Sequence, residues 1–570
     1  MATTIVVVGM ESEEVHTTML DGVVRGSVGF NGLPVSRTKS GRWRSASFII
    51  GVEVAERMAY YGISSNLINY MTGPLNQSTA AAAENVNAWN GAALLLPLLG
   101  AFVADSFLGR YRTIVIATLL YILALGLLTV SAAIRSSDSC SDAACSPSLL
   151  EIIFFFFSLY LVSFAQAGHK PCLQAFGADQ FDGEDKEECK AKSSFFNWWY
   201  FSMNGGIIVA LLFLTYIQEN LSWELGFGIP CITMCLALLV FLLGSTTYRF
   251  RINSDERNPF VRIGLVFLRA VKNRKASLNV VCADERAQQY QAYEDAQFEF
   301  LDKALLTQDG LEEDKNASSA GDVADARAIL RFIPIWCTCL GFGIVSAQDS
   351  TLFTKQGATM DRHVIYGFEI PAASLLALDC LSVIAFVPIY DLVLVPIARG
   401  LTKKPCGITK LQRIGTGLLL SFLSMACAAV VERRRLATAA KYGLVEKADA
   451  TVPMSIWWLA PQYILLGLGN VFTMVGLQEF FYDEVPSALK SIGLALYLSI
   501  FGIGCFLSSF LISVIERATE SRDGRESWFS NNLNRAHLDY FYLLLAAISA
   551  VAFTAYACFA RSYIYNGKDN

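Results

Sequence analysis

Residues 51–62 (GVEVAERMAYYG) place three ionisable side chains inside an apolar run that covers residues 46–71. Glu53, Glu56 and Arg57 fall at positions i, i+3 and i+4, so they share one face of a helix with about 3.6 residues per turn. The run is about 25 residues long, which is enough to cross a hydrocarbon layer about 30 Å thick. Charged groups at that depth are costly unless they face one another or a wet cavity. The stretch therefore predicts the floor of a pathway through a membrane.

The combination of two acids with one base allows two interpretations. Arg57 needs only one carboxylate for neutralisation, so the second buried acid is placed to take up a proton. This favours proton coupling by Glu53, Glu56 and Arg57. The alternative is a Glu–Arg pair that only pins two helices together.

The composition is that of a membrane protein. Of the 570 residues, 54% are hydrophobic and 17% are charged, and the mean hydropathy is +0.42. A net charge of −5 without a basic domain excludes a nucleic-acid-binding protein, and the apolar content excludes a disordered scaffold. We therefore expect an all-α protein that crosses a membrane several times.

Runs of about 20 apolar residues occur twelve times and fall into two sets of six. We expect an N-terminal six-helix bundle over residues 45–248 and a C-terminal one over 329–560. The charged segment 249–328 would form a cytoplasmic central loop, and residues 1–44 and 561–570 would form cytoplasmic tails. Transporters built from repeated halves bind their substrate at the interface of the halves, near the membrane midplane.

Several loops have features that predict local structure. Within the central loop, residues 279–302 predict a surface helix and residues 311–325 a mobile linker. Arg433–Arg435 lie in a predicted outer loop, against the positive-inside rule, unless the preceding helix runs on past the membrane. Cys140 and Cys145 share a short polar loop and could pair if it faces an oxidising side.

The opening stretch resembles the ExxER motif of the proton-coupled oligopeptide transporter family, and specifically of its plant branch of nitrate and peptide transporters. Other stretches resemble the same family in the same order: residues 100–114 (GAFVADSFLGRYRTI), 168–182 (GHKPCLQAFGADQFD), 196–200 (FNWWY), 350–362 (STLFTKQGATMDR), 461–483 and 495–499. The resemblance covers nearly the whole chain. It implies the major facilitator fold, in which two six-helix bundles rock around a central cavity.

The turn after the second span predicts a gate. Asp105, Arg110 and Arg112 supply a carboxylate and two guanidiniums that could lock the two halves on the cytoplasmic side, or could simply anchor the loop there. Thr113 follows Arg110 at +3, as in sites of basic-directed kinases, and resembles a phosphorylated position of a related nitrate carrier. A phosphate there would add about two negative charges. Glu479, at the end of the tenth span, is a candidate for the inner gate.

Lys170 lies in the predicted fourth span, where a lysine needs an anionic partner from the protein or the substrate. The resemblance implies that Lys170 pairs with the first-span cluster and either holds a substrate carboxylate or couples the proton. Tyr60 and Tyr200 could line a cavity and stack on an organic substrate. The alternative is an interfacial aromatic belt, which suits Trp198 and Trp199 better than Tyr60.

Departures from the family pattern concern the substrate. Asn470 stands where family members commonly have an acid, so a peptide amino terminus would lose its anchor. Ser346 stands where one nitrate-carrying relative has a histidine. Asp349 and Asp379 are acids in the seventh and eighth spans where the pattern has neutral residues. Either could replace the missing acid, or could serve helix packing instead.

These features predict a proton-coupled symporter of a small, anionic solute such as nitrate, a short peptide or a carboxylated metabolite or hormone. The alternatives are a pH-independent facilitator or channel, or a nutrient sensor that signals through the central loop. The expected partners are the substrate, protons, the lipid bilayer and a cytoplasmic kinase, without nucleic acid. Four histidines without ligand spacing predict neither a metal site nor a cofactor, and His169 is read as a bystander. No enzyme motif is present, and the expected location is the plasma membrane or the vacuolar membrane.

Overall fold

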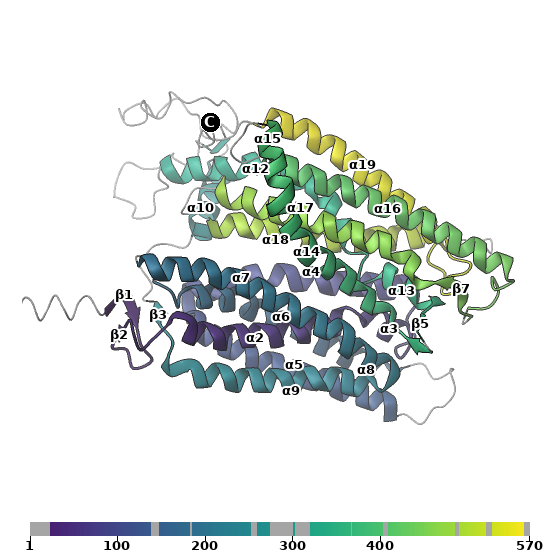
Figure 1. Cartoon of the computed structure of the whole chain (residues 1–570), viewed down its shortest axis with the longest axis horizontal. Helices are drawn as coiled ribbons and strands as arrows, with labels where there is room; N and C mark the ends of the chain where they lie inside the picture. The colour runs from purple at the N-terminus through teal and green to yellow at the C-terminus, as the bar shows by residue number, and fades with distance from the viewer. Residues whose placement is uncertain are drawn as a thin grey trace, which may run out of the picture. The chain divides into compact units, whose positions relative to one another are not determined.

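The computed structural model describes residues 23–137, 147–182, 185–251, 259–273, 300–301, 320–365, 367–402, 408–448, 450–484, 490–519 and 527–563 (Figure 1). Most of the surface helix predicted over residues 279–302 lies outside these ranges, as do Cys140, Cys145 and most of the linker predicted over residues 311–325.

Long apolar helices dominate the described residues, and eleven of them could cross a membrane by length and composition. The first half of the chain supplies α4 (Thr79–Val103), α5 (Arg110–Ser137), α6 (Leu149–Ala178), α7 (Lys186–Val209), which continues into α8 (Thr215–Asn220), and α9 (Trp223–Leu243). The second half supplies α12 (Ala320–Ser346), α14 (Leu376–Ile389), α16 (Lys410–Lys441), α17 (Ala460–Asp483), α18 (Lys490–Thr519) and α19 (Leu538–Ser562).

Helix α2 (Arg42–Ser64) completes a set of twelve. It carries Glu53, Glu56 and Arg57 close together, whereas the apolar windows of the eleven others hold at most two charged residues each. The apolar run continues past the break after Ser64 as the short helix α3 (Leu67–Thr72). The twelve-span, all-α architecture expected from the sequence is therefore confirmed.

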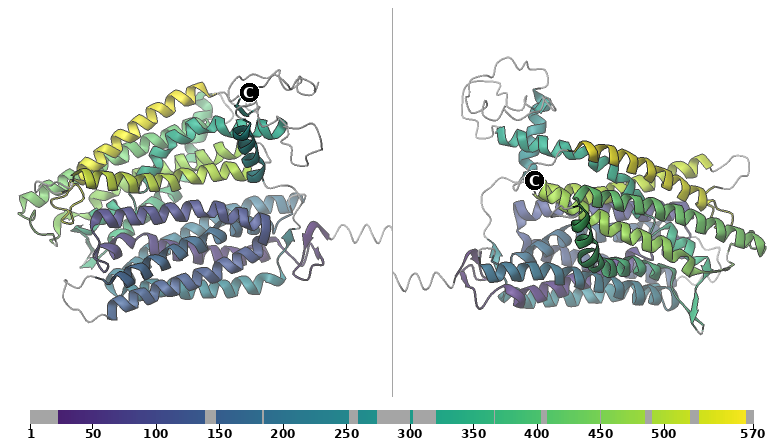
Figure 2. Two further views of the ribbon diagram at one scale, coloured as in Figure 1. Left: turned by 180° about the vertical axis from the view of Figure 1, so that it is seen from behind. Right: turned by 45° about the horizontal axis from the view of Figure 1, so that its top comes forward.

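The described chain divides into two compact units. One contains residues up to 255 together with 350–380, and the other contains 256–349 together with 381–570. In the first, α2 packs against α7 and α9, and α6 packs against α4 and α5 (Figures 1 and 2). In the second, α16 packs against α17 and α19, and α12 packs against α18. The division into bundles and tails by sequence position remains a prediction.

A close approach fixes α7 beside α2. A Cβ added to Gly206 of α7 would lie 2.7 Å from the backbone oxygen of Val54 and 3.4 Å from Cβ of Arg57. Glycine at this position therefore lets the two backbones touch next to the charged cluster. A Cβ added to the neighbouring Gly205 would meet nothing within 4 Å.

Residues 350–380 are tied to the helices of the first unit. They contain α13 (Leu352–Ala358), β5 (His363–Ile365) and β6 (Phe368–Glu369). Lys355 Nζ donates to Thr72 Oγ1 at 2.8 Å, and Arg362 forms an ion pair with Glu219 at 2.7 Å. These contacts explain why the segment groups with helices that precede it by more than 100 residues.

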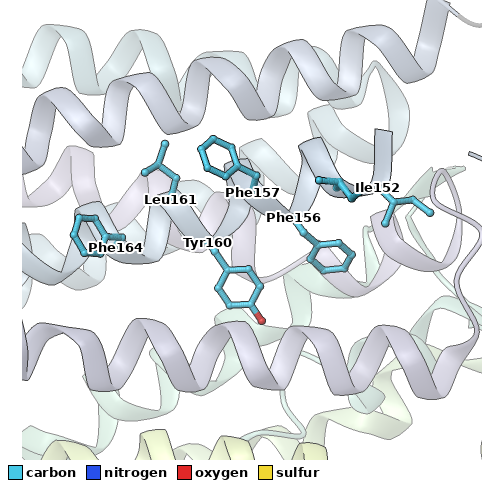
Figure 3. A pocket seen from close by; sticks show the side chains of 7 residues that line it. Ile152, Phe156, Phe157, Tyr160, Leu161 and Phe164 are labelled. Carbon is cyan, nitrogen blue, oxygen red and sulfur yellow. The ribbon is translucent and has the colours of Figure 1, made fainter. Parts of the chain in front are cut away.

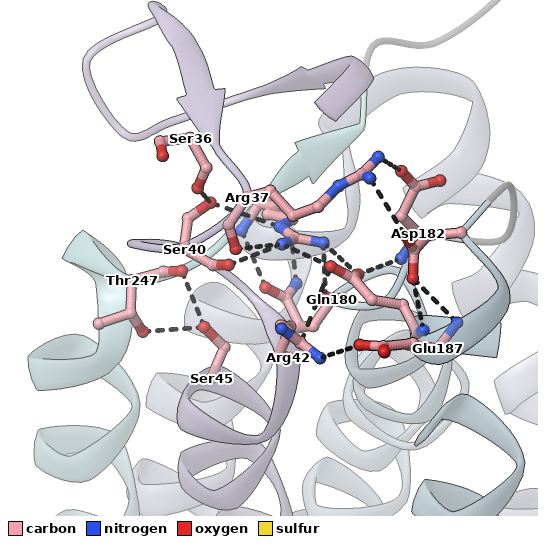
Figure 4. Close-up of polar contacts among 12 residues, drawn as sticks. Ser36, Arg37, Ser40, Arg42, Ser45, Gln180, Asp182, Glu187 and Thr247 are labelled. Atoms are coloured by element: carbon pink, nitrogen blue, oxygen red, sulfur yellow. Dashed lines mark hydrogen bonds and ion pairs between the residues drawn. The ribbon is translucent and has the colours of Figure 1, made fainter. Parts of the chain in front are cut away.

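A three-stranded sheet joins the start of α2 to the segment after α9. Its order is β2 (Pro34–Ser36), β1 (Val23–Val28) and β3 (Phe250–Arg251). Beside it, Arg249 is 1% exposed, pairs with the equally buried Glu188 at 2.7 Å and donates to the carbonyl of Ser40 at 2.7 Å. Figure 4 shows the polar contacts around Ser40. Gly41 has φ 71°, and a Cβ there would lie 2.2 Å from Nε of Arg249. No pattern in the sequence indicates this network.

Two other segments differ from expectation or resolve an alternative. Helix α12 begins at Ala320, so the prediction of a mobile linker is wrong for residues 320–325. The reason is that Asp322 and Asp325 of α12 pair with Arg262 of α10 (Pro259–Lys272), at 2.5 and 3.2 Å. Helix α16 runs on to Lys441, which accounts for the arginines at 433–435.

Candidate functional site

The three ionisable residues of α2 form one buried cluster. Arg57 Nε lies 2.9 Å from Glu53 Oε1, and Arg57 Nη2 lies 2.6 Å from Glu56 Oε2. The residues are 3%, 3% and 0% exposed for Glu53, Arg57 and Glu56. One guanidinium is thus shared between two carboxylates in an environment where charge is costly. The structure brings together the three residues that the sequence singled out.

Gln166 of α6 distinguishes the two carboxylates, and sequence reasoning missed it. Its Nε2 donates to Glu56 Oε1 at 2.7 Å, and the side chain is fully buried. Glu56 therefore accepts a hydrogen bond from Gln166 and forms an ion pair with Arg57. Oε2 of each carboxylate is buried, and neither has a hydrogen-bond partner among the residues described, so the hydrogen bond from Gln166 is what distinguishes Glu56 from Glu53. The only sequence signal was position, because Gln166 precedes Lys170 by one helical turn.

Lys170 lies on the same face of α6 and is half-buried. Its ammonium is 5.8 Å from the centre of the Tyr60 ring, within range of a cation–π interaction. It is attracted electrostatically by Glu53 and Glu56 and repelled by Arg57. Tyr60 itself is 8% exposed and donates to Asn90 Oδ1 at 3.0 Å. The structure thus places Lys170 and Tyr60 beside the charged cluster.

His169 is fully buried next to Lys170. The centres of its ring and the Tyr121 ring of α5 are 6.5 Å apart, and the two rings meet edge to face. Neither ring nitrogen has a hydrogen-bond partner among the residues that the structure describes. Among all the residues that the structure describes, no group of three or more His, Cys, Asp or Glu side chains is arranged to hold a metal ion.

In the turn after α4, Arg110 forms an ion pair with a residue that was not predicted from the sequence. Arg110 Nη1 lies 2.5 Å from Oδ2 of Asp179, at the end of α6. Gly109 has φ 76°, as the tight turn requires. Arg112 is exposed, and the backbone of Asp105 lies in the turn that precedes Gly109. The observed ion pair joins α5 to α6.

Thr113 occupies the first turn of α5. It is 6% exposed, and its hydroxyl donates to the backbone oxygen of Gly109 at 3.0 Å. A kinase would need this turn to open before it could reach the hydroxyl. Phosphorylation of Thr113 stays a prediction.

The remaining candidates of the tenth and seventh spans lie in the second unit. Asn470 of α17 is 7% exposed. Ser346 is the last residue of α12, and Asp349 follows three residues later; both are half-buried. The hydroxyl of Tyr463 donates to the backbone oxygen of Asp349 at 3.3 Å. Glu479 is half-exposed and pairs with Arg413 of α16 at 3.2 Å.

The aromatic candidates divide by exposure. Tyr200 and Trp198 are 46% and 55% exposed, whereas Trp199 is 3% exposed and packs against Phe195. The interfacial position favoured for Trp199 is therefore wrong, because its ring belongs to the core of the first unit. Asp379, in the first turn of α14, is half-buried.

A separate apolar hollow lies on the outer face of α6. Its volume is about 490 Å³, and Figure 3 shows the side chains that line it. Its lining residues are Ile152, Ile153, Phe156, Phe157, Tyr160, Leu161 and Phe164. All seven come from one helix, and Phe157 is 60% exposed, as expected for a surface that faces lipid. The hollow contains none of the charged candidates.

The twelve-helix fold and the buried charged cluster define a multi-pass membrane transporter of the major facilitator type. A family model described as the POT family matches residues 111–529. The chain therefore belongs to the POT family.

Relatives and solved structures agree with this assignment. The protein NRT1/PTR FAMILY 5.10 of Arabidopsis thaliana is 60% identical over 95% of this chain and 97% of its own length. NRT1/PTR FAMILY 5.14 of the same plant is 55% identical over 96% and 97%. The fold resembles an auto-inhibited POT family peptide transporter at TM-score 0.70 and 22% identity, over 92% of this chain and 99% of that one.

Proposed function

We propose that the protein is a proton-coupled symporter that moves a small anionic solute by alternating access. The observation that carries the proposal is the unequal environment of the two buried carboxylates. Glu56 has an ion pair with Arg57 and a hydrogen bond from Gln166, whereas in the described part of the chain Glu53 has the ion pair with Arg57 alone. Of the two acids, Glu53 is therefore the one that can accept a proton without losing a second hydrogen bond.

Charge balance connects the proton to the solute. Glu53, Glu56, Arg57 and Lys170 sum to zero when all four are charged. A proton on Glu53 leaves one net positive charge, which favours an anion beside Lys170. A bound anion favours the proton by the same free energy, because coupling between two binding events is reciprocal. Empty and doubly loaded sites are then the stable states, and these are the states a symporter must carry across.

The substrate class follows from the same residues. Tyr60 lies beside Lys170 and offers a ring on which an organic anion could stack. Asn470 can donate and accept hydrogen bonds but carries no charge, so it does not supply an anchor for a peptide amino terminus. A solved POT family transporter of the same fold is in complex with 5-aminolevulinic acid. Nitrate and carboxylated metabolites fit the proposed site better than dipeptides do.

The gating residues form ion pairs that could open and close with the transport cycle. Arg110 pairs with Asp179 in the first unit, and Arg413 pairs with Glu479 in the second. We assign both pairs to gates on the cytoplasmic side. Asp105 and Arg112 would assist the first of them.

The test is uptake at controlled external pH in a heterologous cell, with labelled nitrate, a dipeptide and 5-aminolevulinic acid as probes. We expect uptake of an anion to rise with external acidity and to be lost in Glu53→Gln and in Glu56→Gln. Uptake that is indifferent to pH and unaffected by both substitutions would indicate a facilitator or channel. Normal surface expression of each variant, measured on intact cells, is the control.

A further inference from the structure

We propose that Gln166 is a positioning residue that decides which of the two carboxylates takes the proton. The inference rests on the proposed function, in which Glu53 is the proton acceptor. Gln166 does not exchange a proton itself. It holds Glu56 in the charged form against Arg57 and thereby leaves the proton to Glu53.

The geometry gives Gln166 this role. Glu56 is fully buried, and its two oxygens are each engaged, Oε1 by Nε2 of Gln166 at 2.7 Å and Oε2 by Nη2 of Arg57 at 2.6 Å. A protonated Glu56 would have to give up one of these donors, because an O–H group competes with N–H donors for the same lone pairs. Glu53 faces no such loss, since its contact among the described residues is the ion pair with Arg57 at 2.9 Å, without a donor that corresponds to Gln166.

Gln166 shares α6 with Lys170. Gln166 and Lys170 lie one turn apart on α6, whereas both carboxylates lie on α2. A movement of α6 relative to α2 would change the Gln166–Glu56 distance and the position of Lys170 together. The proton acceptor and the anion site would then respond to the same helix movement. A hydrogen bond within α2 could not provide this link.

The other titratable groups around the cluster do not take over this role. Tyr121 of α5 and His169 of α6 both interact electrostatically with Glu56, and Lys170 interacts with both acids. None of the three forms a hydrogen bond with Glu56 in the described chain, where Gln166 is the side chain that does. Removal of the Gln166 amide therefore removes a specific donor and leaves the surrounding charges in place.

The test uses infrared spectroscopy of the full-length protein in nanodiscs, because the stretching band of a protonated carboxyl reports proton binding without any substrate. In the wild-type protein we expect one buried carboxyl band that appears on acidification. Glu53→Gln should abolish it. In the double variant Glu53→Gln/Gln166→Met the band should return, because Glu56, with one donor fewer, becomes able to bind the proton.

The matched control is Gln218→Met in the Glu53→Gln background. Gln218 is 2% exposed and donates to the backbone oxygen of Gly62 at 2.6 Å. Gly62 lies in α2 beyond the charged cluster, on the C-terminal side of Arg57. Gln218→Met should not restore the band. If Gln166→Met fails to fold, Gln166→Asn retracts the amide by one methylene and should restore the band in the same way. A band that stays absent in well-folded Gln166 variants would overturn the proposal.

A transport measurement separates this proposal from the proposed function. Gln166→Met alone should weaken the pH dependence of anion uptake. Loss of the hydrogen bond should change the proton affinity of Glu56 about tenfold, since a hydrogen bond to a charged group contributes that much. Wild-type uptake without pH dependence would refute the symport proposal but leave the infrared result to stand or fall by itself. Pronounced wild-type pH dependence with an identical profile in Gln166→Met would refute the role of Gln166 alone.

Discussion

At the scale of single residues, the proposed site contains a second cation, Lys170, to which the described residues bring no carboxylate as close as the two that contact Arg57. Lys170 lies against the Tyr60 ring and is drawn toward Glu53 and Glu56 without forming their short contacts. An ammonium held in this way can turn to a bound anion at little cost. This property distinguishes a substrate-binding lysine from one that is locked in a structural ion pair.

Substitution of Lys170 tests this assignment. Lys170→Gln should raise KM for the transported anion about tenfold or more, because a charged hydrogen bond to the solute contributes about 1.5–3 kcal/mol. Lys170→Arg should lose less affinity, since it keeps the charge. Concentration-dependent uptake at fixed acidic pH measures both. An unchanged KM in Lys170→Gln would show that the lysine does not bind the solute.

Residue-scale prediction from the sequence succeeded where spacing carries the information. The i, i+3, i+4 pattern of Glu53, Glu56 and Arg57 placed them on one face of one helix, and the structure has them in contact. Gln166 could not be found in this way, because its contact with Glu56 joins positions 110 residues apart. Asp179, the partner of Arg110, could not be found for the same reason, because it is distant in sequence, whereas Asp105 is near.

At the scale of elements, the contact between α2 and α7 holds the charged cluster. Gly206→Ala places a methyl group 2.7 Å from the Val54 carbonyl, so the helices must separate. We expect a loss of about 1–3 kcal/mol in the free energy of unfolding, as for other overpacked interfaces. Gly205→Ala is the matched control, because a Cβ there meets nothing within 4 Å. Thermal unfolding in detergent compares the two, and equal melting temperatures would contradict the packing argument.

The segment before α2 is fixed by Arg249 and Glu188. Removal of one member of a buried ion pair leaves the other charge uncompensated, which costs about 3–5 kcal/mol. Arg249→Met should therefore destabilise the first unit strongly, whereas Arg42→Met should not, because Arg42 is 45% exposed and its contacts are 3.8 Å long. The double variant Arg249→Met/Glu188→Met should recover part of the loss. Melting temperatures measured in detergent would contradict this if Arg249→Met matched Arg42→Met.

Element boundaries were predictable where a helix is apolar and less so where tertiary contacts extend it. Helix α4 begins at Thr79 because Ser78 caps it by accepting from the backbone N–H of Ala81 at 3.2 Å. Helix α12 begins inside a polar segment because Arg262 neutralises Asp322 and Asp325. Neither the cap nor the ion pairs contribute to hydropathy.

At the scale of the whole molecule, the twelve apolar runs were sufficient to predict a polytopic all-α protein, and the motif order predicted the family. The sequence did not indicate that residues 350–380 pack with the first unit. That grouping depends on pairs such as Lys355–Thr72 and Arg362–Glu219, which join positions 283 and 143 residues apart. Long-range polar contacts of this kind leave no periodic pattern in a sequence.

The central claim is that one proton, carried by Glu53, moves with each anion. The most direct measurement is proton entry into proteoliposomes that contain a pH-sensitive dye, with the transported anion added outside. We predict anion-dependent proton entry for the wild-type protein. For Glu53→Gln we predict continued anion exchange without proton entry. Proton entry at the wild-type rate in Glu53→Gln, or anion entry without protons in the wild type, would contradict the claim.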